Sequence, residues 1–344
     1  MKINIIGFSS KGCALAKRIS EELKEHECSY FGKTIGDEHG AVHVDSVDEW
    51  TKGSFKTCDA LIFVGAAGIA VRHIAPYVRS KIKDPAVIVI DELGMNVIPI
   101  LSGHIGGGNA LSKVISERTG AALILTTASD INKRFAVDVF AKNNGLHMNS
   151  MKAAKSIAAR ILEGLPVHVR SDIKAEDSLP EGLTYADNGE AGIYITPYEG
   201  PDPFKETLRL TPKNMTIGIG CHRNIEMRVV EERVRNVLKE NKISVRSLRA
   251  GASIDLKADE KGLLEFFEKY EIPATFFSKD ELEKVKGDFT ESDYVRSITG
   301  VGNVCERSAL AVSDGGEIIV KKNAGNGVTV AVAREHKTIR FGGI

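Results

Sequence analysis

The chain has 344 residues, of which 42% are hydrophobic and 27% charged, and its 46 Lys and Arg are balanced by 46 Asp and Glu. This length exceeds what one compact core usually holds and predicts two or three domains. The charge balance excludes a protein-wide field that would favour nucleic acid or a membrane surface, so any anion site must be local.

The positions of the cysteines and the hydropathy of the chain argue against disulfide-rich, zinc-binding, secreted and membrane-spanning proteins. The five cysteines are scattered, at positions 13, 28, 58, 221 and 305, and none forms a CxxC pair. This spacing argues against a disulfide framework and against a structural zinc site, so no metal ligands are predicted. Reduced thiols favour a cytoplasmic location. No apolar stretch reaches the roughly 18 residues that span a bilayer, and the N-terminal run lacks signal-peptide features.

The first part of the chain alternates short apolar runs with amphipathic segments. Apolar runs predict strands over 3–8, 60–68, 86–91, 96–101 and 121–127. Helical spacing predicts helices over 11–25, 71–82 (with Pro76 as a kink) and about 107–119, and Gly120 fits a helix C′ position. Such alternation is typical of a mainly parallel sheet with helices on its faces.

The middle of the chain has a different composition. Six of the ten prolines lie between 166 and 212, and short strands are predicted at 166–170 and 192–196, so we expect 141–213 to form a small irregular domain or an ordered connector. Alternation resumes with strands over 216–220, 244–252, 273–277 and 328–334, and with helices over 229–241, 259–270 and 279–286. The predicted fold class is α/β: two α/β/α domains with mainly parallel sheets, 1–140 and 214–344, joined by the Pro-rich middle region.

The stretch SGHIGGGN, residues 102–109, follows a predicted strand and precedes a predicted helix. A helix start leaves backbone N–H groups unpaired, and glycines let an anion approach them closely. Those glycines are Gly106, Gly107 and Gly108, and Asn109 is a candidate cap. Ser102 and His104 lie where strand ends place reactive groups, and a histidine can move a proton near neutral pH. The alternative is a tight turn with a packing role.

The stretch GAAGIAVRHIAP repeats this arrangement of strand, small residues and helix start. Gly65 and Gly68 are candidates for close approach of a ligand, and Arg72 and His73 are candidate partners for carboxylates or phosphates. The alternative is a solvated basic helix face.

Two further corners lie in the second alternating region. GIGCHRN carries Cys221, His222 and Arg223, which favour a carboxylate-binding corner over a Cys–His dyad, because sequence neighbours usually point apart. TGVGNVCERSAL carries Gly300, Gly302 and Glu306, although the helix dipole alone favours a glutamate in a first turn.

The stretch TTASD ends a predicted strand in the first region. Its Asp130 is a candidate base or an orienting partner for His104, with a helix cap as the alternative.

These motifs carry a resemblance to a known family. GAAGIAVRHIAP and the long stretch from DPAVIVID to LILTTASD resemble the N-terminal domain of the cobalt-precorrin-5A hydrolase (CbiG) family of anaerobic cobalamin synthesis. GIGCHRN, IDLKADEKGLLEF, GVGNVCERSAL and GVTVAVAR resemble its C-terminal domain. The resemblance covers nearly the whole chain, the Pro-rich middle least. This chain has GGGN where the family usually has GGAN, and V-C-E where the family has V-A-E.

The resemblance implies a hydrolase that acts on a cobalt-bound tetrapyrrole. Such an enzyme opens a δ-lactone on ring A of cobalt-precorrin-5A and releases acetaldehyde, giving cobalt-precorrin-5B. It implies no separate cofactor, because the substrate carries the cobalt, and it implies hand-over to neighbouring methyltransferases of the pathway. No nucleic-acid or membrane partner is expected, and a homodimer is one candidate oligomeric state.

For this reaction we expect His104 to be the general base, with Asp130 and Glu306 as secondary acid/base candidates. Ser102 and the glycine amides are candidate donors to an oxyanion or a substrate carboxylate, and Arg72 and Arg223 are candidate carboxylate clamps. We expect the loops at 65–73 and 102–109 to face those at 220–224 and 300–306. The alternatives are a non-catalytic carrier of a tetrapyrrole intermediate and a nucleotide-dependent enzyme with an atypical phosphate loop.

Overall fold

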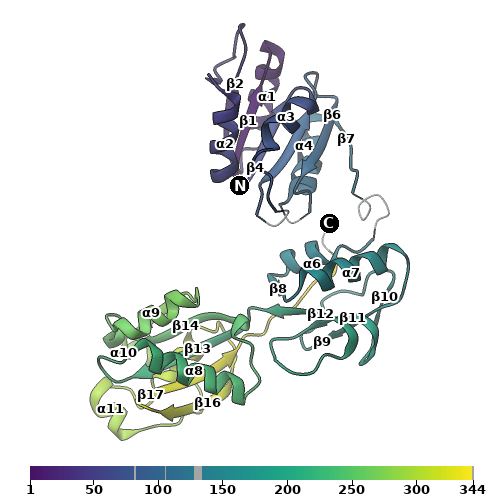
Figure 1. The fold of residues 1–344 in the computed structure, drawn as a ribbon. Helices are drawn as coiled ribbons and strands as arrows, with labels where there is room; N and C mark the ends of the chain where they lie inside the picture. The colour runs from purple at the N-terminus through teal and green to yellow at the C-terminus, as the bar shows by residue number, and fades with distance from the viewer. Residues whose placement is uncertain (81–82, 105, 128–133, 343–344) are drawn as a thin grey trace. The chain divides into compact units, whose positions relative to one another are not determined.

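A computed structural model describes residues 1–80, 83–104, 106–127 and 134–342. The chain divides into two compact units, the first spanning Met1–Val139 and the second beginning at Phe140. The fold class is α/β with mostly parallel sheets, as predicted from the alternation of apolar runs and amphipathic segments (Figure 1). Among the described residues, none of the helices combines the length and the apolar composition that a bilayer crossing requires.

The first unit contains a seven-stranded sheet, in which β6 and β7 run opposite to the other strands. Its spatial order is β3 (Val42–His43), β2 (Glu27–Gly32), β1 (Lys2–Gly7), β4 (Ala60–Val64), β5 (Ala86–Ile90), β6 (Asn96–Leu101) and β7 (Ala122–Leu123). The central strands β4 and β5 are buried along their whole length, because helices cover both faces of the sheet.

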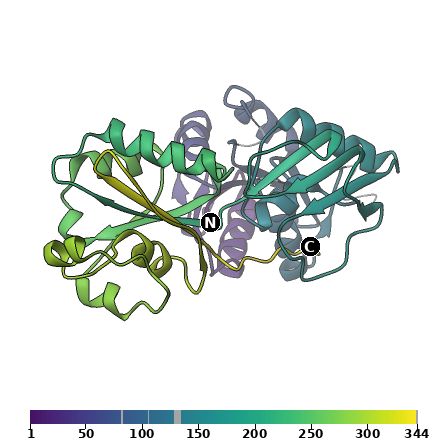
Figure 2. The same cartoon turned by 90° about the horizontal axis from the view of Figure 1, so that it is seen from below.

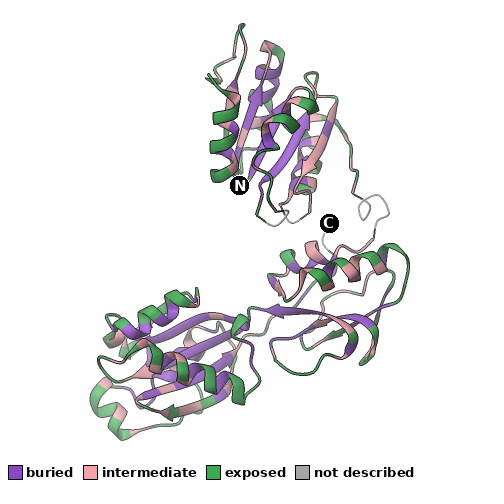
Figure 3. Cartoon of the chain, in the orientation of Figure 1, coloured by how far each residue is buried: buried purple, intermediate pink, exposed green. Residues whose placement is uncertain are grey.

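Two pairs of helices cover this sheet. One face packs against α1 (Ser10–Glu22) and α4 (Gly108–Thr119). The other face packs against α2 (Val47–Thr57) and α3 (Ala67–Ile74), and the boundary between the two units falls within α6 (Val137–Asn143). The outer sides of these helices are exposed while the strands between them are buried (Figure 3).

The helix predicted over 71–82 is wrong in position. Helix α3 starts at Ala67 and ends at Ile74, two residues before Pro76. Ala75 still has helical dihedrals and donates to the carbonyl of Val71, but Pro76 has no N–H with which to continue the hydrogen-bond ladder, so the helix stops there.

The middle region forms an ordered five-stranded sheet, so neither an irregular domain nor a connector describes it. Its spatial order is β10 (Leu183–Tyr185), β9 (Val167–Ser171), β11 (Gly189–Ile195), β12 (Phe204–Pro212) and β8 (Leu146–Met148). Only β8 is antiparallel to its neighbour, and α7 (Met151–Leu162) packs on the sheet. The prolines lie in the connections and at the end of β12, where no ladder N–H is lost.

The last region forms a third sheet with five strands. Their order is β15 (Ala274–Phe277), β14 (Leu248–Ile254), β13 (Met215–Cys221), β17 (Val328–Arg334) and β16 (Glu317–Gly325). Strands β13, β14 and β15 are parallel, while β17 is antiparallel to β13 and to β16. The hairpin of β16 and β17, in yellow, completes the sheet (Figure 2).

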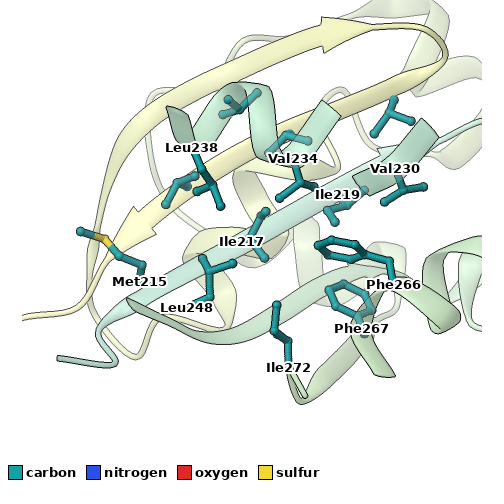
Figure 4. Packing of buried hydrophobic residues seen from close by; sticks show 14 of the residues in the cluster. Met215, Ile217, Ile219, Val230, Val234, Leu238, Leu248, Phe266, Phe267 and Ile272 are labelled. Carbon is teal, nitrogen blue, oxygen red and sulfur yellow. The ribbon is translucent and has the colours of Figure 1, made fainter. Parts of the chain in front are cut away.

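Helices lie on both faces of this third sheet. One face buries a cluster of aliphatic and aromatic side chains beneath α8 (Met227–Glu240) and α9 (Lys261–Lys269) (Figure 4). The other face packs against α12 (Cys305–Ala311). Two shorter helices, α10 (Lys279–Lys284) and α11 (Asp293–Thr299), lie between β15 and α12 in the chain. The α/β pattern predicted from residue 214 onward is therefore present.

Candidate functional site

The SGHIGGGN loop joins β6 to α4, and several of its backbone N–H groups donate to carbonyl groups of the same loop. The N–H of Gly107 donates to the carbonyl of His104 (3.0 Å), that of Gly108 to Ser102 (3.2 Å), and that of Asn109 to Gly103 (2.8 Å). These three N–H groups are already paired, which corrects the expectation that the amides of Gly107 and Gly108 are available to an anion.

Crowding explains why the loop is rich in glycine. Ser102 has a φ of +52° and Gly107 a φ of +84°. A Cβ on Gly106 would lie 2.4 Å from the Cβ of Ser102, and a Cβ on Gly108 would lie 3.3 Å from the Ser102 carbonyl. The glycines therefore allow a tight turn, which is the packing alternative for this motif.

His104 lies beside a carboxylate that the sequence did not single out. Its Nδ1 is 3.6 Å from Oδ1 of Asp138, and both side chains are mostly buried, with exposed fractions of 17% and 16%. Asp138 is in the first turn of α6, far enough along the chain that no local motif connects it to His104. Asp130, the partner considered from the sequence, lies outside the described residues.

The hydroxyl of Ser102 and the amide of Asn109 complete this corner. Ser102 Oγ is buried and has no hydrogen-bond partner among the residues that the structure describes. Asn109 Nδ2 donates to Oγ1 of Thr127 at 3.5 Å, which ties the start of α4 to the chain that follows β7. The corner thus holds a buried hydroxyl two residues before an imidazole that has a carboxylate beside it.

The GAAG corner, residues 65–68, lies at the opposite end of the strands of the same sheet from the SGHIGGGN loop. These two motifs therefore do not form one pocket. Leu101 pairs with Val87 at the start of β5, whereas Gly65 follows the end of β4, which pairs with the end of β5. The antiparallel direction of β6 separates them, because its carboxyl end meets the amino ends of the parallel strands.

Other details of the GAAG corner also fit a structural role. His73 Nδ1 pairs with Asp48 Oδ1 at 2.7 Å, which ties α3 to α2. A Cβ on Gly68 would meet nothing within 4 Å, so a glycine is not required there. Arg72 is exposed and makes no ion pair within the described ranges. Of the residues predicted at this corner, it alone remains a candidate to bind a substrate carboxylate.

The second unit contains a cavity of about 630 Å³, which we call the C-terminal cavity. It lies where β13 and β14 end and β17 begins, and α11 forms part of its wall. Both predicted corners of this region contribute to it, through Cys221, His222 and Arg223 on one side and Thr299, Val304 and Cys305 on the other. The position matches the rule that ligands bind beyond the carboxyl ends of parallel strands.

Cations and apolar groups share the lining of the C-terminal cavity. Arg223, Lys257 and Lys322 line it, and no carboxylate does among the described residues. Arg223 forms an ion pair with Asp259, and the buried Glu260 lies 3.8 Å from both Arg223 and Lys257. The cavity can therefore attract an anionic ligand that also has apolar surface.

A second cavity, of about 600 Å³, shares Arg223 but has a different character. Its lining includes the carboxylates Glu226, Asp259, Glu260 and Glu265. Arg228 and Lys261 also line it, so its charges are mixed, whereas no carboxylate lines the C-terminal cavity among the described residues; the C-terminal cavity is therefore the better candidate site for an anionic ligand.

Glu306 does not face the C-terminal cavity. It is fully buried, and its two carboxylate oxygens accept hydrogen bonds from the N–H groups of Thr290 (2.9 Å) and Lys322 (2.7 Å). A carboxylate used in this way fixes two chain segments, which argues against the acid/base role considered for it.

The glycines near Glu306 also have structural explanations. Gly300 has a φ of +81° and ends α11, as left-handed glycines commonly do. A Cβ on Gly302 would lie 1.5 Å from a carboxylate oxygen of Glu291, and that carboxylate pairs with Arg296 and Arg307. Gly302 therefore makes room for an ion-pair cluster.

The two cysteines at the cavity are not activated nucleophiles. Burial raises the pKa of the Cys221 thiol to about 11 and that of Cys305 to about 11. Both stay protonated at neutral pH, and a protonated thiol is a poor nucleophile and a poor metal ligand. Within the described ranges, no group of three or more His, Cys, Asp or Glu side chains is arranged to hold a metal ion.

Comparison with known proteins matches every region of the chain. Family models described as cobalamin synthesis G N-terminal, cobalamin biosynthesis central region and cobalamin synthesis G C-terminus match residues 49–130, 135–212 and 215–333. A cobalt-precorrin-5A hydrolase from Priestia megaterium is 30% identical, over 96% of this chain and 94% of its own length. A cobalt-precorrin-5A hydrolase from Salmonella typhimurium is also 30% identical, over 94% of this chain and 95% of its own length.

One solved structure of similar extent is a cobalamin biosynthesis protein G homologue from Sulfolobus solfataricus. It is 22% identical, covers 97% of both chains and has a TM-score of 0.42.

Proposed function

Because this chain belongs to the cobalt-precorrin-5A hydrolase family, we propose that it opens the ring A lactone of cobalt-precorrin-5A and releases acetaldehyde. The observation that supports this most is the C-terminal cavity, which combines apolar walls with three cationic side chains. A tetrapyrrole has flat apolar faces and a rim of acetate and propionate groups, so these two kinds of surface match it. The substrate brings the cobalt, and we propose no resident cofactor.

The proposed reaction has two steps. In the first, water attacks the acyl carbon of the lactone, the acyl C–O bond breaks, and the water proton passes to a base while the released oxygen gains a proton. In the second, the base removes the proton of the new alcohol, the bond to the macrocycle breaks, and acetaldehyde leaves. The electron pair of that bond enters the macrocycle, so no oxidant or reductant is consumed.

His104 is our candidate for the base. A neighbouring carboxylate orients an imidazole and stabilises its protonated form, and Asp138 lies at 3.6 Å from Nδ1. The nearby hydroxyl of Ser102 is our candidate donor to the developing oxyanion, because it is buried and has no partner among the described residues.

The role of His104 is tested by the variant His104→Asn. We expect kcat for acetaldehyde release to fall by about 100-fold or more, since positioned bases commonly contribute this much. His43→Asn is the matched control, because His43 is an exposed histidine whose ring is paired with Glu38. A His104→Asn enzyme that keeps its parental kcat would remove His104 from the mechanism.

The function itself is tested by incubating the full chain with cobalt-precorrin-5A and trapping volatile aldehyde. We expect one acetaldehyde for each substrate converted to cobalt-precorrin-5B. Tight binding without aldehyde would instead identify a carrier of the intermediate. The five free thiols support our further proposal that the protein works in a reducing compartment, the cytoplasm.

A further inference from the structure

Helix α11 presents two large apolar side chains to solvent at the C-terminal cavity. Tyr294 and Ile298 are 70% and 59% exposed, and both line the cavity. They are four residues apart, so they lie on one face of the helix. Val295 packs inward against the buried cluster that includes Ile254 and Val304.

Capping interactions hold this apolar face in place. Ser292 caps the start of α11 by accepting a hydrogen bond from Val295 N–H, and Gly300 ends the helix. Arg296, on the same helix, pairs with Glu291 at 2.6 Å. The exposed pair is therefore part of a fixed wall, and exposed apolar surface at the rim of a cavity commonly marks a binding site.

Lys322 supplies a cation with no counter-charge of its own. It lies on β16, is partly buried and lines the cavity, and its ammonium has no ion-pair or hydrogen-bond partner in the part of the chain that the structure describes. By contrast, the charges of Arg223 and Lys257 are opposed by Asp259 and Glu260. An ammonium without a protein counter-charge can pair with a carboxylate of an anionic ligand.

The neighbouring lysine shows that this arrangement is specific to one side of β16. Lys321 is 58% exposed and pairs with Asp288 at 2.7 Å, and it does not line the cavity. The pairing of β16 with β17 is irregular between Val320 and Asn323, so the two lysines are distinguished by their contacts and not by strand alternation. The two adjacent lysines therefore form a natural pair of test and control positions.

We propose that Tyr294 and Ile298 form the apolar wall against which the macrocycle lies, while the Lys322 ammonium binds one of its peripheral carboxylates. These residues would orient the substrate and make the cavity selective for a carboxylate-bearing macrocycle. This inference rests on the proposed function for the identity of the substrate, but the binding surface can be tested separately.

The probe for binding is uroporphyrin III, a stable macrocycle with carboxylates around its rim, titrated by fluorescence at about 0.15 M salt, where long-range effects are screened. We expect Lys322→Gln to raise the Kd by about tenfold, the size of one charge-assisted hydrogen bond. Lys322→Arg should retain most of the affinity, and Lys321→Gln should change the Kd by less than about twofold. Equal losses in Lys321→Gln and Lys322→Gln, or none in Lys322→Gln, would overturn the proposal.

The apolar wall is tested in the same titration with Tyr294→Ser and Ile298→Ser. Each should weaken binding by about fivefold or more, because each removes apolar area that the ring face covers. Leu264→Ser is the control, since Leu264 is an exposed leucine of α9 outside the cavity. Unchanged affinity in both α11 variants would contradict the proposed wall.

Turnover separates failure of this inference from failure of the proposed function. With cobalt-precorrin-5A, Lys322→Gln should raise KM by about tenfold and leave kcat within about threefold, as expected for lost uniform binding. If the parental chain releases acetaldehyde but Lys322→Gln keeps its KM, the orienting role is wrong and the hydrolase function stands. If the parental chain releases none while Lys322→Gln loses the probe, the function is wrong and the binding surface stands.

Discussion

At the scale of single residues, burial decides which of the chemically suggestive side chains can act. Glu306 belongs to a motif that resembles the family, yet it is fully buried and holds the backbone of Thr290 and Lys322. The His104 side chain is mostly buried but still partly exposed, and its ring lies beside the carboxylate of Asp138. Sequence identifies residue types that can do chemistry, whereas their solvent exposure depends on contacts made far along the chain.

The structural role of Glu306 predicts a loss of stability. Glu306→Ala should lower the free energy of unfolding by about 3 kcal/mol, because the N–H groups of Thr290 and Lys322 lose the buried carboxylate that accepts from both of them. Glu306→Gln, which keeps one acceptor oxygen, should lose less. Urea denaturation measures both, with Glu265→Ala, at an exposed i, i+4 pair, as a control expected within about 0.5 kcal/mol of the parent. Parental stability in Glu306→Ala would contradict this role.

At the scale of elements, the sequence indicated most helices and strands but not the direction of β6. The apolar run NVIPIL predicts a strand, and the structure has one at Asn96–Leu101. The short turn after β5 makes β6 a hairpin partner rather than the next parallel strand. Only four residues separate the apolar runs 86–91 and 96–101, which favours a hairpin, since a parallel pair needs a long crossover. The short connection was the feature of the sequence that could have revealed an antiparallel β6. This strand direction places the two glycine-rich corners of the first unit at opposite ends of the sheet's strands.

The contact between β13 and α12 predicts that Gly218 is indispensable. A Cβ on Gly218 would lie 1.9 Å from the backbone carbonyl of Cys305, so the strand and helix would have to separate. Gly218→Ala should destabilise the protein by about 3 kcal/mol, in the range of overpacked cores. Gly68→Ala, in an open position on α3, should be neutral or stabilising by up to about 1 kcal/mol. Thermal unfolding compares them, and similar melting temperatures for the two variants would refute this reading of the contact.

At the scale of the whole molecule, the α/β class and the C-terminal cavity could be predicted more fully than the middle region. Apolar runs between helical segments reveal parallel strands, whereas β10 and β8 have only three residues each and give little periodicity. Of the cations that line the cavity, Lys322 comes from a segment without a motif, and Lys257 lies in the stretch IDLKADEKGLLEF, where nothing in the sequence singles it out. The expectation that loops of both units serve one substrate stays a prediction.

The measurement that tests the central claim most directly is mass spectrometry of the product that the full chain forms from cobalt-precorrin-5A in ¹⁸O-labelled water. Hydrolysis of the lactone places one labelled oxygen in the ring A acetate, because water attacks the acyl carbon. We predict this label in cobalt-precorrin-5B, together with one acetaldehyde for each product. Acetaldehyde release with an unlabelled acetate would contradict attack of water at the acyl carbon, and bound, unchanged substrate would contradict catalysis by this chain.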